Sequence, residues 1–205
     1  MPSIDHVILD VPDTTAAEAF YKSAFELGDA VRVRESQEPA SGFRGFTLSL
    51  VVSQPADVDA LVDAACEAGA TSLKPAAKSF WGYGGVVQAP DGAIWKVATS
   101  NKKNSGPATK VAEQVVLLLG VEDVKATKAF YAERGLAVGK SFGGKYVEFD
   151  LPGSALTLAL YKRPALAKDA GVPAEGQGSH RIRVAGETGP LTDPDGFVWV
   201  ATSVA

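Results

Sequence analysis

Few side chains of this sequence could hold a metal ion or act as a nucleophile. The 205 residues include two histidines, His6 and His180, and a single cysteine, Cys66. A catalytic divalent metal needs about three converging His, Asp or Glu ligands and an open position for the substrate. Both histidines and a distant carboxylate would have to meet, so the sequence disfavours a metal. It also gives no assignable Ser-His-Asp or Cys-His arrangement, and we expect Cys66 to be a small buried residue of a helix.

Aromatic residues among glycines are better candidates for a binding site. Trp81 and Tyr83 lie in the segment Phe80-Trp81-Gly82-Tyr83-Gly84-Gly85. Glycines lower the cost of unusual backbone angles, and aromatic rings combine apolar area with a polar edge. The segment therefore predicts a mobile loop that closes over a ligand. It lacks the spacing and the following helix of a phosphate-binding glycine loop.

Three further side chains have an orientation that the sequence leaves open. Lys96 lies in an expected strand directly after a tryptophan, and its ammonium group either faces solvent or meets an anionic partner. Tyr146 and Glu148 alternate with Val147 and Phe149, so the two pairs point to opposite faces of a strand. If Val147 and Phe149 pack on a helix, Tyr146 and Glu148 line a cavity; otherwise they are exposed.

Periodicity and turn residues predict the elements that position these side chains. In the first half they predict helices over 14–25 and 55–68, and strands over 3–12, 30–34, 43–52, 71–74, 84–88 and 93–99. In the second half they predict a helix over 123–134, a loop or short helix over 163–178, and strands over 112–121, 137–142, 145–151, 155–162 and 180–184. This order predicts an α+β fold, with helices on one face of mixed or antiparallel sheets.

Two phrases occur twice, in the same order. Ala19-Phe20-Tyr21 returns as Ala129-Phe130-Tyr131, and Pro90-Asp91-Gly92-x-x-Trp95 returns as Pro194-Asp195-Gly196-x-x-Trp199. Repetition over half of a chain indicates two related structural units. We expect both tryptophans to be core residues.

The segment between the two units has the composition of a linker. Residues 100–109 are polar, contain Gly and Pro and show no periodicity. We therefore predict one domain over 1–99 and a second over 110–205, each with a sheet of its own.

The motifs together resemble a known family. The opening Ile4-Asp5-His6-Val7-x-Leu9-x-Val11-x-Asp13 with Phe20-Tyr21 is similar to the start of a glyoxalase/bleomycin-resistance domain. So is the closing part, with Lys74-Pro75, the segment 80–85 and Pro90-Asp91-Gly92-x-x-Trp95. The resemblance to this vicinal oxygen chelate superfamily covers nearly the whole chain. It implies two tandem glyoxalase-like domains of βαβββ modules, whose curled sheets enclose a cup.

The resemblance also implies positions for metal ligands. Metal-dependent members use His or Gln on opening strands and a carboxylate on closing strands, and the resemblance places His6 and Lys96 in one cup. His6 fits the opening position and His180 is a candidate in the second half, but Lys96 and Val200 occupy the closing positions. The hairpin strand that often carries a Glu reads Leu158-Ala159-Leu160-Tyr161. We therefore expect no metal and no cofactor.

Three classes of function stay open at this point. The first is metal-independent binding of a small organic molecule, partly aromatic or anionic, in a sheet-lined cup, as the bleomycin-resistance side of the family implies. The second is a metal-dependent glyoxalase, lyase or dioxygenase, and the third is a degenerate domain that acts by protein contacts. We favour the first, with these ligand-binding residues: His6, Trp81, Tyr83, Lys96, Tyr146, Glu148 and His180.

Composition limits the partners. The net charge is −4 and no stripe of Lys and Arg is present, so a nucleic acid or an anionic membrane surface is an unfavourable partner. No apolar run approaches the ~18 residues of a membrane span, and no signal peptide is evident at the N-terminus. We expect a cytoplasmic monomer or homodimer that binds a small molecule.

Overall fold

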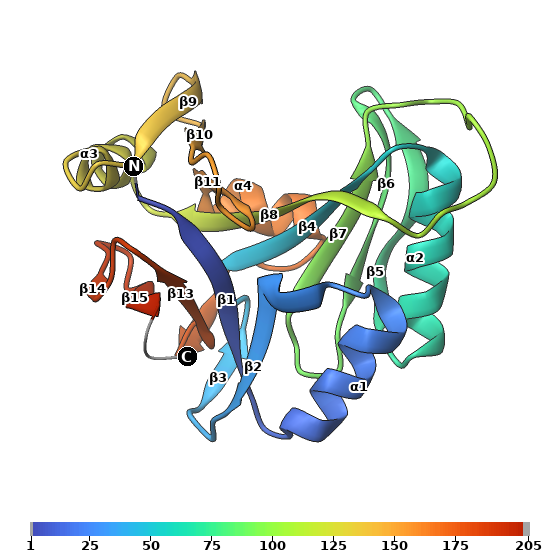
Figure 1. Cartoon of the computed structure of the whole chain (residues 1–205), viewed down its shortest axis with the longest axis horizontal. Helices are drawn as coiled ribbons and strands as arrows, with labels where there is room; N and C mark the ends of the chain where they lie inside the picture. The colour runs from blue at the N-terminus through green and yellow to red at the C-terminus, as the bar shows by residue number, and fades with distance from the viewer. Residues whose placement is uncertain (1, 203–205) are drawn as a thin grey trace.

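Two sheets organise the protein, whose structure is a computed structural model that describes residues 2–202 (Figure 1). The large sheet has the strand order β5-β6-β7-β4-β8-β11-β10-β9, and the small sheet has the order β14-β15-β13-β1-β2. A short pair, β3 (Ala40–Gly42) and β12 (Gly176–Gly178), forms a third sheet. Both main sheets are mixed, because β4 runs parallel to β7 and antiparallel to β8, and β1 runs parallel to β2 and antiparallel to β13.

Most expected strands are present with bounds that differ by a few residues, β5 is longer than expected, and β3, β12, β14 and β15 fall outside the expected ranges. The large sheet contains β4 (Phe46–Val52), β5 (Thr71–Ser79), β6 (Gly82–Gln88), β7 (Ile94–Thr99), β8 (Ala112–Val121), β9 (Ala137–Phe142), β10 (Tyr146–Asp150) and β11 (Thr157–Lys162). The small sheet contains β1 (Ile4–Val11), β2 (Val31–Glu35), β13 (Ile182–Gly186), β14 (Leu191–Thr192) and β15 (Val198–Val200).

Four α-helices accompany the sheets within residues 2–202: α1 (Thr14–Ala24), α2 (Pro55–Glu67), α3 (Val124–Ala132) and α4 (Arg163–Ala170), with a 3-10 turn at Gly28–Ala30. Asp13 caps α1 by accepting a bond from the Ala16 N–H, and Asp123 caps α3 in the same way. Each aspartate satisfies backbone donors that the first helical turn leaves free. None of the helices in this part of the chain is long and apolar enough to cross a membrane.

Both main sheets contain strands from both halves of the chain. In the large sheet, β4 of the first half pairs with β8 of the second, with Ser49 opposite Val116. In the small sheet, β1 pairs with β13, with Ile8 opposite Arg183. The α+β class with large mixed sheets is confirmed, but the expectation that each half forms its own sheet is wrong. Pairing across the halves lets both sheets contribute their apolar faces to one shared core.

That core lies between the sheets and the helices α1, α2 and α3. It contains Val7, Leu9 and Val11 of β1, Leu48 and Leu50 of β4, Leu117 and Leu119 of β8, Phe20 of α1, Leu61 of α2 and Tyr131 of α3. Cys66 does not join it and is exposed, so the expectation of a buried thiol is wrong. The buried face of α2 includes Ala65, and the next residue is turned by about 100° around the helix axis.

The first copies of the two repeated phrases contact each other. The Tyr21 hydroxyl of α1 donates to Asp91 Oδ2 at 2.6 Å, and the Tyr21 ring lies 5.5 Å from the ring of Trp95. Burial, and then the charge of Asp91, raise the pKa of Tyr21 well above its usual value. The hydroxyl therefore stays protonated and joins the helix to the turn before β7.

The second copies form a similar contact through a different aspartate, which comes directly before the repeated Pro-Asp-Gly phrase. The Tyr131 hydroxyl of α3 donates to Asp193 Oδ2 at 2.7 Å and accepts a bond from Trp199 Nε1 at 3.0 Å. The two rings again lie 5.5 Å apart. Trp95 and Trp199 are almost fully buried, so the repeated residues stabilise the fold and lie in its core.

Replacing Tyr131 with Phe should lower the free energy of unfolding by about 2 kcal/mol, because the substitution takes a donor from a buried carboxylate and an acceptor from a buried indole. Denaturant unfolding measures the change. Tyr161→Phe is the control, since the Tyr161 hydroxyl has no hydrogen bond in the described structure; its effect should stay below about 0.5 kcal/mol. Equal effects of the two substitutions would contradict this role of Tyr131.

Candidate functional site

The large sheet has a second face, opposite the core. On β4, the core residues Leu48 and Leu50 alternate with Thr47 and Ser49. Ser49 lies beside Lys96 on β7 and Val116 on β8, so all three point to this second side. We call this side the cup face; its central residues are Thr47, Ser49, Val86, Ile94, Lys96, Val116, Leu118, Thr157, Ala159 and Tyr161.

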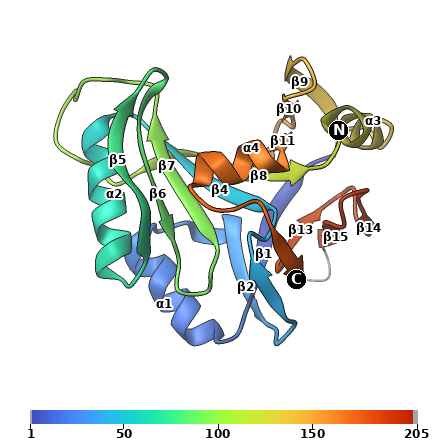
Figure 2. The same ribbon diagram turned by 180° about the vertical axis from the view of Figure 1, so that it is seen from behind.

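Helix α4 lies on the cup face, whereas α2 and α3 pack on the core side (Figures 1 and 2). Its buried residues Leu166, Ala167 and Ala170 form a small apolar cluster with Val86 and Ile94. The close approach requires a glycine on β8, because a Cβ at position 120 would lie 3.2 Å from both the Arg163 Cα and the Leu166 Cδ2. The helix therefore fills the middle of the cup face.

Two lysines of the cup face hold the C-terminal end of α4. Lys74 Nζ donates to the carbonyl oxygens of Lys168 and Asp169 at 2.7 and 2.6 Å, which satisfies acceptors that a helix end leaves free. Lys96 Nζ lies 2.7 Å from Asp169 Oδ2. Of the two orientations that the sequence left open for Lys96, the structure has the one with an anionic partner. That partner is Asp169.

A pocket of about 330 Å³ remains beside this end of α4. Its walls come from β5, β6 and β7, and its lining includes Lys74, Lys78, Lys96, Trp81 and Asp169. Lys74 donates to backbone carbonyls only, and Lys78 forms no ion pair within residues 2–202. Lys78 lies opposite Tyr83, whose side chain points toward α2, so the ammonium groups that face Asp169 are those of Lys74 and Lys96. Two ammonium groups against one carboxylate leave this part of the pocket with net positive charge.

The segment 80–85 is not the mobile loop that we expected. Gly82–Gln88 is the strand β6, paired with β5 on one side and β7 on the other. A Cβ at Gly84 would lie 2.9 Å from the Val97 oxygen, and one at Gly85 would lie 3.2 Å from Val62 Cγ2. Close packing, rather than mobility, requires these two glycines.

The two aromatic residues of that segment point to different places. Trp81 is at the tip of the β5–β6 hairpin, 81 % exposed, with its ring 4.9 Å from the ring of Phe80. Tyr83 also lines the pocket, but its hydroxyl donates to Asp59 Oδ1 of α2 at 2.7 Å. Trp81 is thus free to contact a ligand at the rim, while Tyr83 is anchored to the helix.

Tyr146 and Glu148 lie on the cup face as well. Val147 and Phe149 are in the core, which decides the orientation that the sequence left open. Glu148 accepts bonds from the Tyr146 hydroxyl at 2.9 Å and from Lys140 Nζ at 2.8 Å. Because β4, β8 and β11 separate β10 from β7, this pair is far from Lys96. The two ends of the cup face are therefore separate environments.

The two histidines lie elsewhere. His180 stacks on Phe197 with ring centroids 3.9 Å apart, and its ring nitrogens contact the carbonyl oxygens of Arg44 and Asp195. His6 is on β1 of the small sheet. Since Lys96 belongs to the large sheet, the expectation that His6 and Lys96 share a cup is wrong. The predicted site residues thus fall into one group, Trp81, Tyr83 and Lys96, and three separate places.

The residues of the cup face do not fit a divalent metal. Four positions lie side by side across β7, β4, β8 and β11, namely Lys96, Ser49, Val116 and Thr157. They offer an ammonium group, an isopropyl group and two hydroxyls, none of which is a strong ligand for such an ion. Nowhere in residues 2–202 do three or more His, Cys, Asp or Glu side chains gather in a metal-binding group.

Sequence reasoning missed α4 as part of the site. The residues Arg163-Pro164, Leu166, Ala170 and Gly171 carry the signals of a short helix, with Pro in its first turn and Gly after its end. Those signals predict the helix and say nothing of where it packs. The sequence therefore did not reveal Asp169 as the partner of Lys96.

Comparison with known proteins identifies the fold. No family model and no curated protein matches the sequence. Among solved structures, glyoxalase I from Zea mays is 15 % identical, covers 98 % of this chain and 92 % of its own, and has a TM-score of 0.61. A point mutant of the same maize enzyme is 15 % identical and has a TM-score of 0.59; the match covers 98 % of this chain and 94 % of the mutant enzyme. A candidate dioxygenase from Bacillus subtilis is 13 % identical with a TM-score of 0.56, covering 89 % of this chain and 69 % of its own. The chain has a glyoxalase-like fold.

Proposed function

We propose that the protein binds a small aromatic anion, without a metal, in the pocket between β5–β7 and the C-terminal end of α4. The observation that carries this proposal is the charge of the pocket: Lys74 and Lys96 face Asp169, which is the only carboxylate among the lining residues. A ligand carboxylate, sulfonate or phosphate would form charge-assisted hydrogen bonds with these lysines. A volume of about 330 Å³ suits a ligand with one or two rings.

The pair between Lys96 and Asp169 gives the ligand a place to enter. Both side chains are partly exposed, at 35 % and 47 %, and exposed ion pairs contribute only ~0–1 kcal/mol. An incoming anion can therefore replace Asp169 at Lys96 at low cost. The exposed ring of Trp81 then offers an apolar surface for the body of the ligand.

Metal independence follows from the same residues. A metal-bound anion would need carboxylates or imidazoles beside the pocket, where the neighbouring positions carry Lys96, Ser49 and Val116; Glu148 lies at the other end of the cup face. The lysines supply the positive charge that a metal would otherwise provide. The protein acts by binding, and no side-chain set around the pocket suggests a reaction step.

A thermal-shift screen with paired compounds tests the proposal. Aryl carboxylates and aryl sulfonates should raise the melting temperature, whereas uncharged arenes of the same size should not. Lys74→Gln should weaken binding of the responding compound about tenfold, because it removes one of the two ammonium groups beside Asp169. Lys103→Gln, in the exposed linker, is the matched control for the loss of one charge. Equal responses to charged and uncharged compounds would contradict an anion site.

A further inference from the structure

The small sheet also has a face that the core does not use, and arginines cover it. Val7, Leu9 and Val11 of β1 enter the core, so His6, Ile8 and Asp10 point to the opposite side. Ile8 lies between Arg32 of β2 and Arg183 of β13, and Asp10 lies beside Arg34 of β2. We call the side that carries His6, Ile8, Asp10, Arg32, Arg34 and Arg183 the arginine face.

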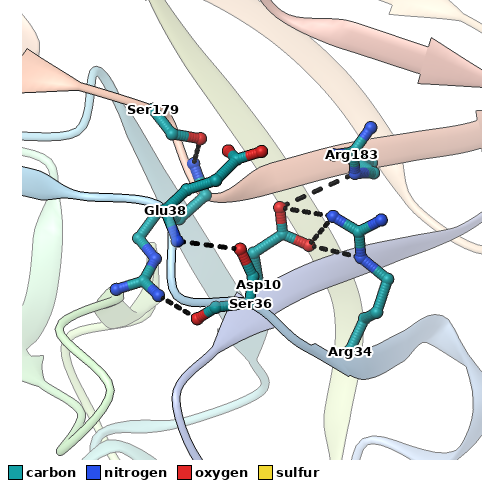
Figure 3. A network of polar contacts seen from close by, with 7 residues as sticks. Asp10, Arg34, Ser36, Glu38, Ser179 and Arg183 are labelled. Carbon is teal, nitrogen blue, oxygen red and sulfur yellow. Dashed lines mark hydrogen bonds and ion pairs between the residues drawn. The ribbon is translucent and has the colours of Figure 1, made fainter.

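One buried carboxylate serves two of these arginines. Asp10 is 2 % exposed and accepts bonds from Arg34 Nε at 2.9 Å and from Arg34 Nη2 at 3.0 Å. Figure 3 shows Arg183 reaching the same carboxylate from the neighbouring strand, with its Nε at 3.6 Å from Asp10 Oδ2. The bidentate bond to Arg34 is the strong one, since it matches the fork of the guanidinium to both carboxylate oxygens.

Two guanidinium groups of this face lack such a partner. Arg183 Nε is buried and makes no hydrogen bond within residues 2–202, although the Arg183 side chain is 24 % exposed. Arg32 is exposed and forms no ion pair with any described residue. Asp10 compensates one of three positive charges and Asp29 lies near Arg32 at the edge of the face, so the face keeps an excess of one positive charge that an anion can bind.

A buried imidazole adjoins the same place. His6 precedes Ile8 by two residues on β1 and is 2 % exposed, yet its Nε2 has no hydrogen-bond partner in the described part of the chain. Burial, and then the charge of Arg32, lower the pKa of His6, while Asp5 and Asp29 act in the opposite direction. A neutral imidazole beside Arg32 offers a polar atom that a ligand could satisfy.

We infer that the arginine face is a second binding site, for a small molecule with a multiply charged oxyanion such as a phosphate group. Arg32 and Arg183 flank Ile8 on adjacent strands, about 10 Å apart at their Cα atoms, and their side chains are long enough to meet an anion above it. Arg34 and Asp10 hold the framework, and His6 adds a neutral contact. If this face only stabilised the fold, the pair of Arg34 and Asp10 would be enough, and Arg32 and Arg183 would not be needed. This site is on the other sheet from the proposed aromatic-anion pocket and does not depend on it.

Calorimetric titration with inorganic pyrophosphate at constant ionic strength tests the inference. The unmodified protein should bind it, and Arg32→Gln and Arg183→Gln should each weaken binding at least fivefold. Lys103→Gln removes one charge from the exposed linker and should change nothing. Arg183→Lys keeps the charge but loses the fork, and should retain part of the affinity. A titration with citrate tests selectivity. Similar affinities for citrate and pyrophosphate indicate a general oxyanion site, and weaker binding of citrate indicates a phosphate-selective site; both results support a site here.

Nuclear magnetic resonance of the imidazole gives a readout that does not depend on any variant. Pyrophosphate should shift the His6 ring signals and leave those of His180 unchanged. Absence of pyrophosphate binding below 10 mM, taking millimolar affinity as roughly the weakest useful binding, would overturn the inference. So would binding that neither shifts the His6 signals nor responds to Arg32→Gln.

Discussion

Lys96→Glu should weaken binding of the aromatic anion about 100-fold, or ~2.7 kcal/mol. The substitution replaces an attractive charge with a repulsive one at the centre of the pocket. It also puts a second carboxylate beside Asp169, whose Oδ2 lies 2.7 Å from the present ammonium. Two carboxylates that close repel each other, so the C-terminal end of α4 should loosen as well. Titration of the variant with the compound that responds best in the screen measures the loss.

Lys96→Met separates the effect of charge from that of shape. Methionine keeps an unbranched side chain and lacks the charge, so affinity should fall only about tenfold. The free energy of unfolding should hardly change, because the exposed pair with Asp169 contributes little. If Lys96→Glu and Lys96→Met bind the anion as tightly as the unmodified protein, Lys96 has no part in the site.

Leu166→Ala should lower the free energy of unfolding by about 3 kcal/mol. Leu166 is 1 % exposed and is the largest apolar side chain by which α4 contacts the cup face. The remaining contacts, from Ala167 and Ala170, are small. The helix should therefore detach before the rest of the protein unfolds, and hydrogen exchange of the amides of Arg163–Ala170 should become much faster.

Leu158→Ala is the matched control for this effect. Leu158 lies in the core on β11 and is fully buried, so its truncation should lower stability by a similar amount. It should leave the exchange of α4 unchanged, because Leu158 points away from the cup face. Equal acceleration of α4 by both substitutions would show that the helix is an inseparable part of the main core.

Local signals carried most of the secondary structure. Asp13 and Asp123 mark the starts of α1 and α3, and both cap their helices. Alternation in β10 placed Val147 and Phe149 on one side and Glu148 on the other, and the position of the core then decided which side is which. Such features depend on residues a few positions apart, and a sequence displays them directly.

The partners of the sheets depend on contacts between distant residues. The edge of β4 could pair with several strands of similar pattern, and neither alternation nor turn residues distinguish β8 from the others. Pairing across the halves emerges only when both apolar faces are buried together. The same limit applies to the site: Lys96 was recognised, but Asp169 is 73 residues away in the sequence.

Glycines were the most ambiguous signal. Gly84 and Gly85 near Trp81 suggested mobility, and the structure places them in β6, paired on both sides, where a Cβ would meet Val97 and Val62. A glycine permits both unusual backbone angles and close approach. The sequence does not distinguish these uses without the neighbouring strand.

The most direct test of metal-independent anion binding is calorimetric titration of EDTA-treated protein with the aryl carboxylate or sulfonate that responds best in the screen. We expect binding of one anion per chain, with the same affinity before and after addition of Zn²⁺, Ni²⁺ or Mn²⁺. Binding that appears only when one of these metals is restored would contradict it.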